Sequence, residues 1–124
     1  MRRPLLTLAG LAVLGGVLAG CGGDDGASGC TPGPQLTVVA EDSLKFGADA
    51  YEVDAGCVEV TYENAGSIAH TLLIKGVKGF KLSVGTTDVG TVQLEPGTYT
   101  LFCDVAGHEA AGMVADLTVT APAG

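Results

Sequence analysis

The sequence predicts an all-β domain, folded as a two-sheet antiparallel sandwich. Seven or eight short segments alternate apolar and polar residues at the period of a β-strand. Clusters of Gly, Asn, Asp, Ser and Pro interrupt these segments at the spacing of about 8 to 12 residues that is typical of sandwiches. No segment shows the periodicity of an amphipathic helix, and 124 residues give room for one such domain.

The strands follow one another from Gln35 onward. In the first half they are expected at residues 36–40, with a continuation at 44–46, and then at 50–53, 58–62 and 71–74. Residues 76–85 form a lysine-bearing connection with room for a short edge strand, and further strands are expected at 87–94, 98–102 and 114–120. This pattern alone leaves an immunoglobulin-like sandwich equally open.

The first 20 residues predict an export signal. Arg2 and Arg3 precede a run of apolar and small residues over 5–19, which is short for a membrane span. The run ends in Leu-Ala-Gly-Cys, which resembles the lipobox of bacterial and archaeal lipoproteins, so we expect cleavage before Cys21 and a lipid on its thiol. An uncleaved helical anchor is the alternative, and the choice between general and twin-arginine export stays open.

Residues 21–34 predict a flexible tether between the lipid and a domain spanning residues 35–121. The tether consists almost entirely of Gly, Asp, Ser, Thr and Pro. This organisation places the domain outside the cytoplasmic membrane, anchored to its outer face at the cell surface or on the periplasmic side.

The mature chain is strongly acidic. Removing residues 1–20 removes both arginines and leaves four lysines against 14 acidic residues, a formal charge of −10. Such a domain is unsuited to nucleic acid, because binding requires basic residues that neutralise phosphates. Anionic headgroups would repel it, so membrane attachment must come from the lipid. We expect a monomer whose protein partner presents a basic face.

The four cysteines divide by position. Cys21 is assigned to the lipid, and Cys103 lies in a loop rich in potential metal ligands. Cys30 and Cys57 remain, and in an exported protein they can form a disulfide that ties the start of the domain to a strand. Pairing of Cys103 with either of them is the alternative, and it would exclude a metal site.

Three potential soft-metal ligands lie on one loop between two predicted strands. Cys103, His108 and Met113 follow the spacing Cys-x4-His-x4-Met, with glycines that allow the backbone to bend between them. The chain has only one other histidine, His70, between a predicted turn and a predicted strand. Two imidazoles, one thiolate and a weak axial thioether are the ligands of an electron-transfer copper centre.

These residues resemble the cupredoxins, the plastocyanin/azurin family of blue copper proteins. The resemblance is carried by E-N-A-G-S-I-A-H-T at 63–71 and Y-T-L-F-C-D-V-A-G-H-E-A-A-G-M at 99–113. It implies a Greek-key β-sandwich with one mononuclear type 1 copper. The implied strong ligands are His70, Cys103 and His108, with Met113 as the long axial ligand. Many members have Asn after the first histidine, so Thr71 implies that a hydroxyl braces the site instead.

The resulting hypothesis is a membrane-tethered electron carrier whose copper cycles between Cu(I) and Cu(II). The implied partners are redox proteins, for example a c-type cytochrome or an oxidase. A copper chaperone or storage lipoprotein is one alternative, and a metal-free structural sandwich is another. An enzyme is not expected, because four protein ligands leave no open coordination position for a substrate.

Overall fold

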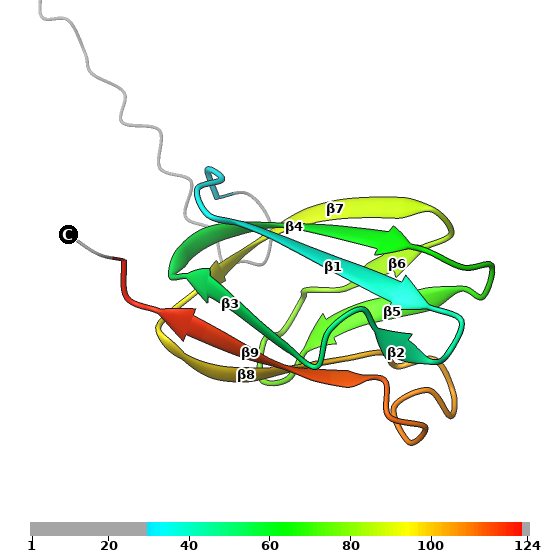
Figure 1. Cartoon of the computed structure of the whole chain (residues 1–124). Helices are drawn as coiled ribbons and strands as arrows, with labels where there is room; N and C mark the ends of the chain where they lie inside the picture. The colour runs from blue at the N-terminus through cyan, green and yellow to red at the C-terminus, as the bar shows by residue number, and fades with distance from the viewer. Residues whose placement is uncertain (1–29, 123–124) are drawn as a thin grey trace, which may run out of the picture.

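In the computed structural model, which describes residues 30–122, every regular element is a β-strand. The strands form two sheets that pack face to face (Figure 1). Their bounds are β1 Gln35–Glu41, β2 Lys45–Phe46, β3 Ala50–Asp54, β4 Gly56–Asn64, β5 His70–Ile74, β6 Leu82–Val84, β7 Thr87–Leu94, β8 Gly97–Phe102 and β9 Val114–Thr120. The prediction of an all-β, two-sheet sandwich is therefore confirmed.

The described part of the chain holds nine strands, where the sequence predicted seven or eight. Residues 45–46 do not continue the first strand. The backbone turns through Leu44, whose φ is +60°, and β2 pairs antiparallel with the end of β1. The short edge strand anticipated within residues 76–85 is β6, which pairs with β5.

The strands are not all antiparallel, which corrects the sequence prediction. One sheet has the order β2-β1-β4-β7 and the other β3-β9-β8-β5-β6. The pairs β1–β4 and β3–β9 are parallel. The chain leaves the first sheet after β2, adds β3 to the second, and returns with β4 running in the direction of β1. Alternating polarity reports which face a residue lies on but not the direction of its strand, so the parallel pairs left no signal in the sequence.

The core lies between the sheets and is built from every second residue along the strands, whose side chains face inward. Its buried side chains include those of β1 (Leu36, Val38, Ala40), β4 (Val58, Val60, Tyr62), β7 (Val92, Leu94) and β9 (Ala115, Leu117, Val119). Burial of each larger side chain is worth roughly 1.5–3 kcal/mol. The same packing fixes the ends of the strands, and the loops at one end carry the candidate site.

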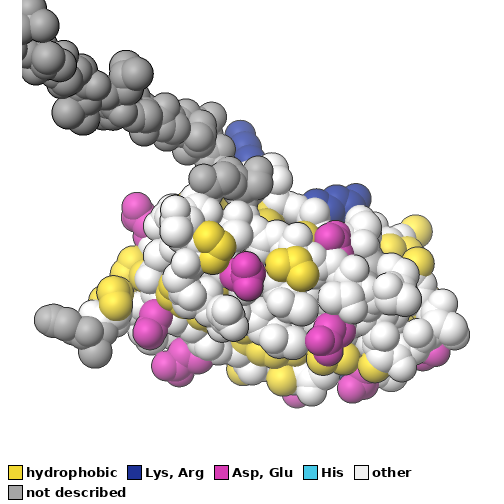
Figure 2. All heavy atoms as spheres, turned by 90° about the horizontal axis from the view of Figure 1, so that it is seen from above, with side chains coloured by type: hydrophobic (Ala, Val, Ile, Leu, Met, Phe, Trp, Pro, Cys, Tyr) yellow, Lys and Arg dark blue, Asp and Glu magenta, His cyan; other side chains and the backbone are white. Residues whose placement is uncertain are grey.

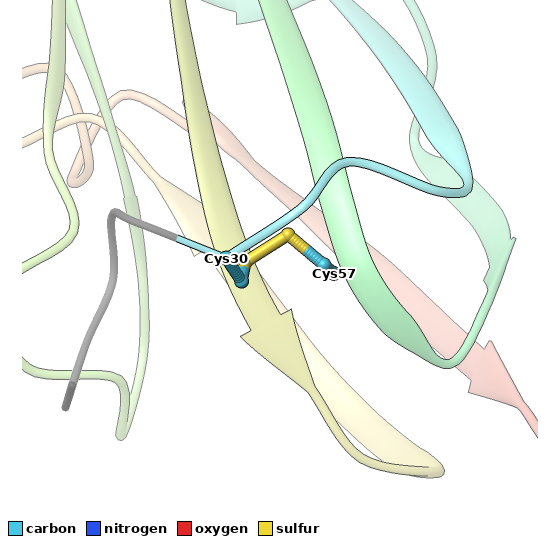
Figure 3. The surroundings of a disulfide bond; sticks show 2 residues. All are labelled: Cys30 and Cys57. Carbon is cyan, nitrogen blue, oxygen red and sulfur yellow. A yellow bond between two sulfur atoms is a disulfide. The ribbon is translucent and has the colours of Figure 1, made fainter. Parts of the chain in front are cut away.

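The predicted disulfide joins Cys30 to Cys57, with the two Cα atoms 5.8 Å apart (Figure 3). Close by, the Gly33 amide donates a hydrogen bond to the Cys57 carbonyl at 2.8 Å. Cys57 lies near the start of β4, whereas Asn64 at its other end leads to His70. Seven strand residues span about 23 Å. The disulfide and the histidine therefore lie near opposite ends of the sandwich.

The predicted signal at 1–20, the lipidated Cys21 and the tether up to residue 29 lie outside the described residues. Within 30–122, no helix is long and apolar enough to cross a membrane.

Candidate metal centre

Three of the four predicted ligands meet at one point. One ligand atom each from His70, Cys103 and His108 lies within 4.8 Å of the others. The Nδ1 atoms of the two histidines are 3.2 Å apart, and His108 Nδ1 is 3.6 Å from Cys103 Sγ. Two imidazole nitrogens and one sulfur therefore converge on a common centre.

His70 is positioned by a turn that two side chains hold. The Asp42 carboxylate accepts hydrogen bonds from the backbone amides of Ser67 and Ile68, both at 2.9 Å. The Asn64 amide side chain accepts from the Gly66 amide at 3.0 Å and donates to the Ile68 carbonyl at 2.7 Å. A Cβ at Gly66 would collide with the Asp42 carboxylate. The turn thus delivers His70 at the first position of β5.

His70 lies in an environment that favours the neutral imidazole. Only 1% of its surface is exposed. Burial and the nearby His108 lower its pKa, and the negative charge of Asp42 opposes them. Its Nε2 atom is buried and has no hydrogen-bond partner among the described residues. Since Nδ1 faces the other donors, a neutral ring presents the lone pair that a metal ion requires.

The loop from Cys103 to Met113 closes on itself through backbone hydrogen bonds. The Cys103 amide donates to the Met113 carbonyl at 3.2 Å, and the Met113 amide donates to the His108 carbonyl at 3.0 Å. Gly107 and Gly112 have φ values of +84° and +109°, which L-residues with a side chain rarely adopt. Both predicted bends are present. Cys103 and Met113 are fully buried, and His108 is half-buried.

The Cys103 sulfur is braced by the residue after His70. The Thr71 amide donates to Sγ at 3.3 Å, while the Thr71 hydroxyl oxygen lies 3.4 Å from Sγ. That hydroxyl also donates to Asp104 Oδ1 at 2.6 Å and accepts from the Asp104 amide at 2.9 Å. A hydroxyl group therefore bridges β5 and the ligand loop, as the presence of Thr71 after the histidine implied.

Asp104 and Lys81 make contacts beside the site that the sequence did not reveal. Lys81 Nζ contacts Asp104 Oδ2 at 3.0 Å. The Thr71 hydroxyl and the Lys81 ammonium group hold the pKa of Asp104 below its ordinary value. Asp104 could have been identified from the sequence, because it directly follows the ligand Cys103. Nothing in the spacing of the chain points to Lys81.

Two further contacts support the site from the core and from the surface. The Tyr62 hydroxyl donates to the Thr71 carbonyl at 3.0 Å, and burial raises the pKa of this phenol far above its ordinary value. Lys75 lies over the Phe102 ring, 4.4 Å from its centroid, and pairs with Glu109 at 2.7 Å. Because Lys75 and Glu109 are about half-exposed, their pair contributes only about 0–1 kcal/mol.

The donor set fits a single copper ion. A thiolate and a thioether suit Cu(I), and imidazoles suit both oxidation states. The thiol and both imidazoles face one buried point. Their lone pairs repel one another there, and a cation bound between them would attract all three. Cys103 is free and buried while Cys30 is bonded to Cys57, so the alternative pairing of Cys103 is excluded. His70, Cys103, His108 and Met113 thus have the arrangement of a type 1 copper site.

Comparisons with known proteins agree with this geometry. Residues 34–120 match the plastocyanin/azurin family of copper-binding proteins. Dithionite-reduced auracyanin from the photosynthetic bacterium Roseiflexus castenholzii is similar in structure, with a TM-score of 0.61 and 21% identity over 74% of this chain and 100% of that one. Auracyanin B gives a TM-score of 0.60 and 20% identity over 76% and 94%. These similarities show a shared fold. No curated protein sequence matches significantly.

The Asp42 brace predicts a pH-dependent contribution to stability. Backbone hydrogen bonds from Ile68 and Ser67 hold the pKa of Asp42 below its usual 3.8 in the folded protein. This contribution is therefore complete above pH about 3.8 and is lost as the pH falls through the lowered folded value. We expect Asp42→Asn to destabilise the apoprotein at neutral pH, with the difference vanishing in acid. Urea unfolding of both proteins across this range measures it, and a difference independent of pH would contradict the assignment.

Proposed function

The chain belongs to the plastocyanin/azurin family of copper-binding proteins. From its copper site we propose that it is a carrier of single electrons, and from the sequence around Cys21 that it is tethered to a membrane. The observation that carries the proposal is the convergence of two imidazoles and one thiol on a buried centre, with ligand atoms within 4.8 Å of one another. Copper is the cofactor for which this donor set is suited.

Bound copper supplies a one-electron couple between Cu(I) and Cu(II). The protein chain keeps the ligands in fixed positions. The hydrogen bonds that close the loop between Cys103 and Met113 hold the ligands in one arrangement, so little of the protein has to move when the charge of the site changes. Full burial of Cys103 and Met113 keeps water from the sulfur atoms, which affects the reduction potential.

His108 is the ligand closest to solvent. It is half-buried, whereas His70 is almost completely buried. Residues on either side of it in the chain, Ala106, Gly107 and Ala110, line a surface hollow together with Cys103, Asp104, Val105 and Glu109. The hollow therefore combines small side chains with two carboxylates next to His108 in the chain. We assign the exchange of electrons to this face.

The same geometry argues against the alternatives. A copper chaperone exchanges its ligands with an acceptor, but here three of the four ligands are buried and the loop is closed by its own hydrogen bonds. A metal-free structural sandwich gives no reason for two histidines and a free cysteine to face one another. Four protein ligands would leave no position for a substrate, so the proposal is a carrier and not an enzyme.

Membrane attachment through Cys21 is supported by the sequence around it, and the disulfide shows where the tether would join the domain. The Leu-Ala-Gly-Cys segment ends at Cys21, nine residues before Cys30. Cys30 is bonded to Cys57, near the start of β4, and the copper ligands lie beyond the other end of that strand. A lipid at Cys21 would therefore be joined to the domain at the end opposite the His108 face.

The charge of the surface favours a basic redox partner, such as a c-type cytochrome or an oxidase. Figure 2 shows acidic side chains spread over one face of the domain, with lysine side chains along one edge. Two of the four lysines, Lys75 and Lys81, are already paired with carboxylates of the ligand loop. Complementary charge would guide the encounter and orient the partner.

The copper–sulfur bond can be tested by its visible spectrum. We expect the copper-loaded protein to show an intense visible charge-transfer band, and Cys103→Ser to lose it because a hydroxyl cannot replace the thiolate. Copper affinity should fall by more than the roughly 10- to 100-fold that loss of an outer-shell partner costs. Met113→Leu is the control, because it keeps the thiolate and hence the band. An intense band in Cys103→Ser would contradict the site.

The lipid on Cys21 can be tested by mass. Intact-mass analysis of the protein extracted from membranes should give a chain that begins at Cys21 and carries a lipid. Cys21→Ala should lack that mass and take up no labelled fatty acid, whereas Cys103→Ser should be labelled like the native chain. Retention of residues 1–20 in the native protein would instead favour an uncleaved anchor.

Electrostatic attraction to a basic partner can be tested by the effect of salt. The second-order rate of electron exchange with a basic c-type cytochrome should fall as ionic strength rises, because salt screens the attraction between opposite charges. A neutral small-molecule oxidant is the control and should react at a rate that salt hardly changes. A cytochrome rate that is equally flat would rule out electrostatic guidance.

A further inference from the structure

The Thr71 hydroxyl lies between two acceptors that compete for its single hydrogen. Its oxygen is 2.6 Å from Asp104 Oδ1 and 3.4 Å from Cys103 Sγ. It also accepts a hydrogen bond from the Asp104 amide at 2.9 Å. A hydroxyl has one donor hydrogen, so it cannot donate fully to both the carboxylate and the sulfur.

Distance and charge both favour the carboxylate. Separations of 2.5–2.7 Å are typical of charge-assisted O–H···O⁻ bonds, which are about twice as strong as neutral ones. Lys81 holds the other carboxylate oxygen at 3.0 Å, which fixes the orientation of the Asp104 side chain. Sulfur is a weak acceptor by comparison. The hydrogen therefore points to Asp104, and the hydroxyl turns a lone pair toward Sγ.

We propose that Asp104 withholds the Thr71 hydroxyl hydrogen from the Cys103 sulfur, so that the sulfur accepts one hydrogen bond, from the Thr71 backbone amide. Asp104 is thus a positioning residue that acts through Thr71, and Lys81 holds it in place. The inference rests on the copper carrier proposed above, because its consequence is a property of the thiolate ligand.

The consequence is a lower reduction potential than the same ligands would otherwise have. Hydrogen bonds to the cysteine sulfur are among the features that tune such sites. A donor at the sulfur withdraws electron density, which favours the reduced site and raises the energy of the sulfur-to-metal transition. Keeping the hydroxyl hydrogen away from Sγ has the opposite effect on both quantities.

A double-mutant cycle between Asp104 and Thr71 tests the proposal. In Asp104→Ala the freed hydroxyl can rotate and donate to Sγ, so the charge-transfer band should move to shorter wavelength and the reduction potential should rise. Adding Thr71→Val to this variant should return the band to its native position. Thr71→Val alone should leave the band nearly unmoved, because the native hydroxyl does not donate to the sulfur.

Glu109→Ala is the matched control for charge. Glu109 lies on the same loop and is paired with a lysine, as Asp104 is, but makes no hydrogen bond to Thr71 or Cys103 among the described residues. Its removal should change the potential through charge alone and leave the band in place. The cycle also cancels the charge effect of Asp104→Ala, because the same carboxylate is lost whether or not the Thr71 hydroxyl is present.

The outcomes distinguish a failure of the Asp104 proposal from a failure of the proposed copper carrier. An unmoved band in Asp104→Ala, or a shift to longer wavelength in Thr71→Val alone, would overturn the proposal while leaving the carrier intact. Absence of the band from the native copper-loaded protein would instead contradict the carrier. Unfolding of each apoprotein in urea shows which variants fold, and Thr71→Val remains decisive if Asp104→Ala does not.

Discussion

Closure of the ligand loop against β5 is the constraint on which the site depends. The Cys103 amide bonds to the Met113 carbonyl, so the two sulfur ligands are held at the two ends of one loop. The Thr71 amide then fixes the Cys103 sulfur from the neighbouring strand. This arrangement brings His70 beside a loop that is more than 30 residues away in sequence. Without it, the chain would have three ligands on a flexible loop and a distant histidine.

The sandwich supplies the rigidity that this closure requires. Core residues of β4 and β9 are almost completely buried, and Tyr62 extends from that core to the Thr71 carbonyl. The disulfide strengthens the opposite end, where the chain enters the domain. In the proposed carrier, one end of the molecule would serve attachment and the other electron transfer. Its acidic surface would repel anionic headgroups and favour a basic protein partner.

The sequence predicted much of this, and the physical reasons for its limits are specific. Alternating polarity located the strands because burial imposes a period of two, and the Cys-x4-His-x4-Met spacing revealed the loop because its ligands are local. The parallel pairing of β1 with β4 was missed because polar and apolar residues alternate in the same way in parallel and antiparallel strands. Lys81 was missed because its contact with Asp104 depends on the pairing of β5 with both β6 and β8. The bracing role of Thr71 was anticipated, but the competition of Asp104 and Cys103 for its hydroxyl hydrogen could be seen only from the distances.

X-ray absorption at the copper edge, recorded for the loaded protein in both oxidation states, tests the central claim most directly. The account predicts one short copper–sulfur distance and two copper–nitrogen distances, with little change in ligand number between the two states, because the loop and β5 hold the donors. Absence of a short sulfur distance, or the loss of a ligand on reduction, would contradict it.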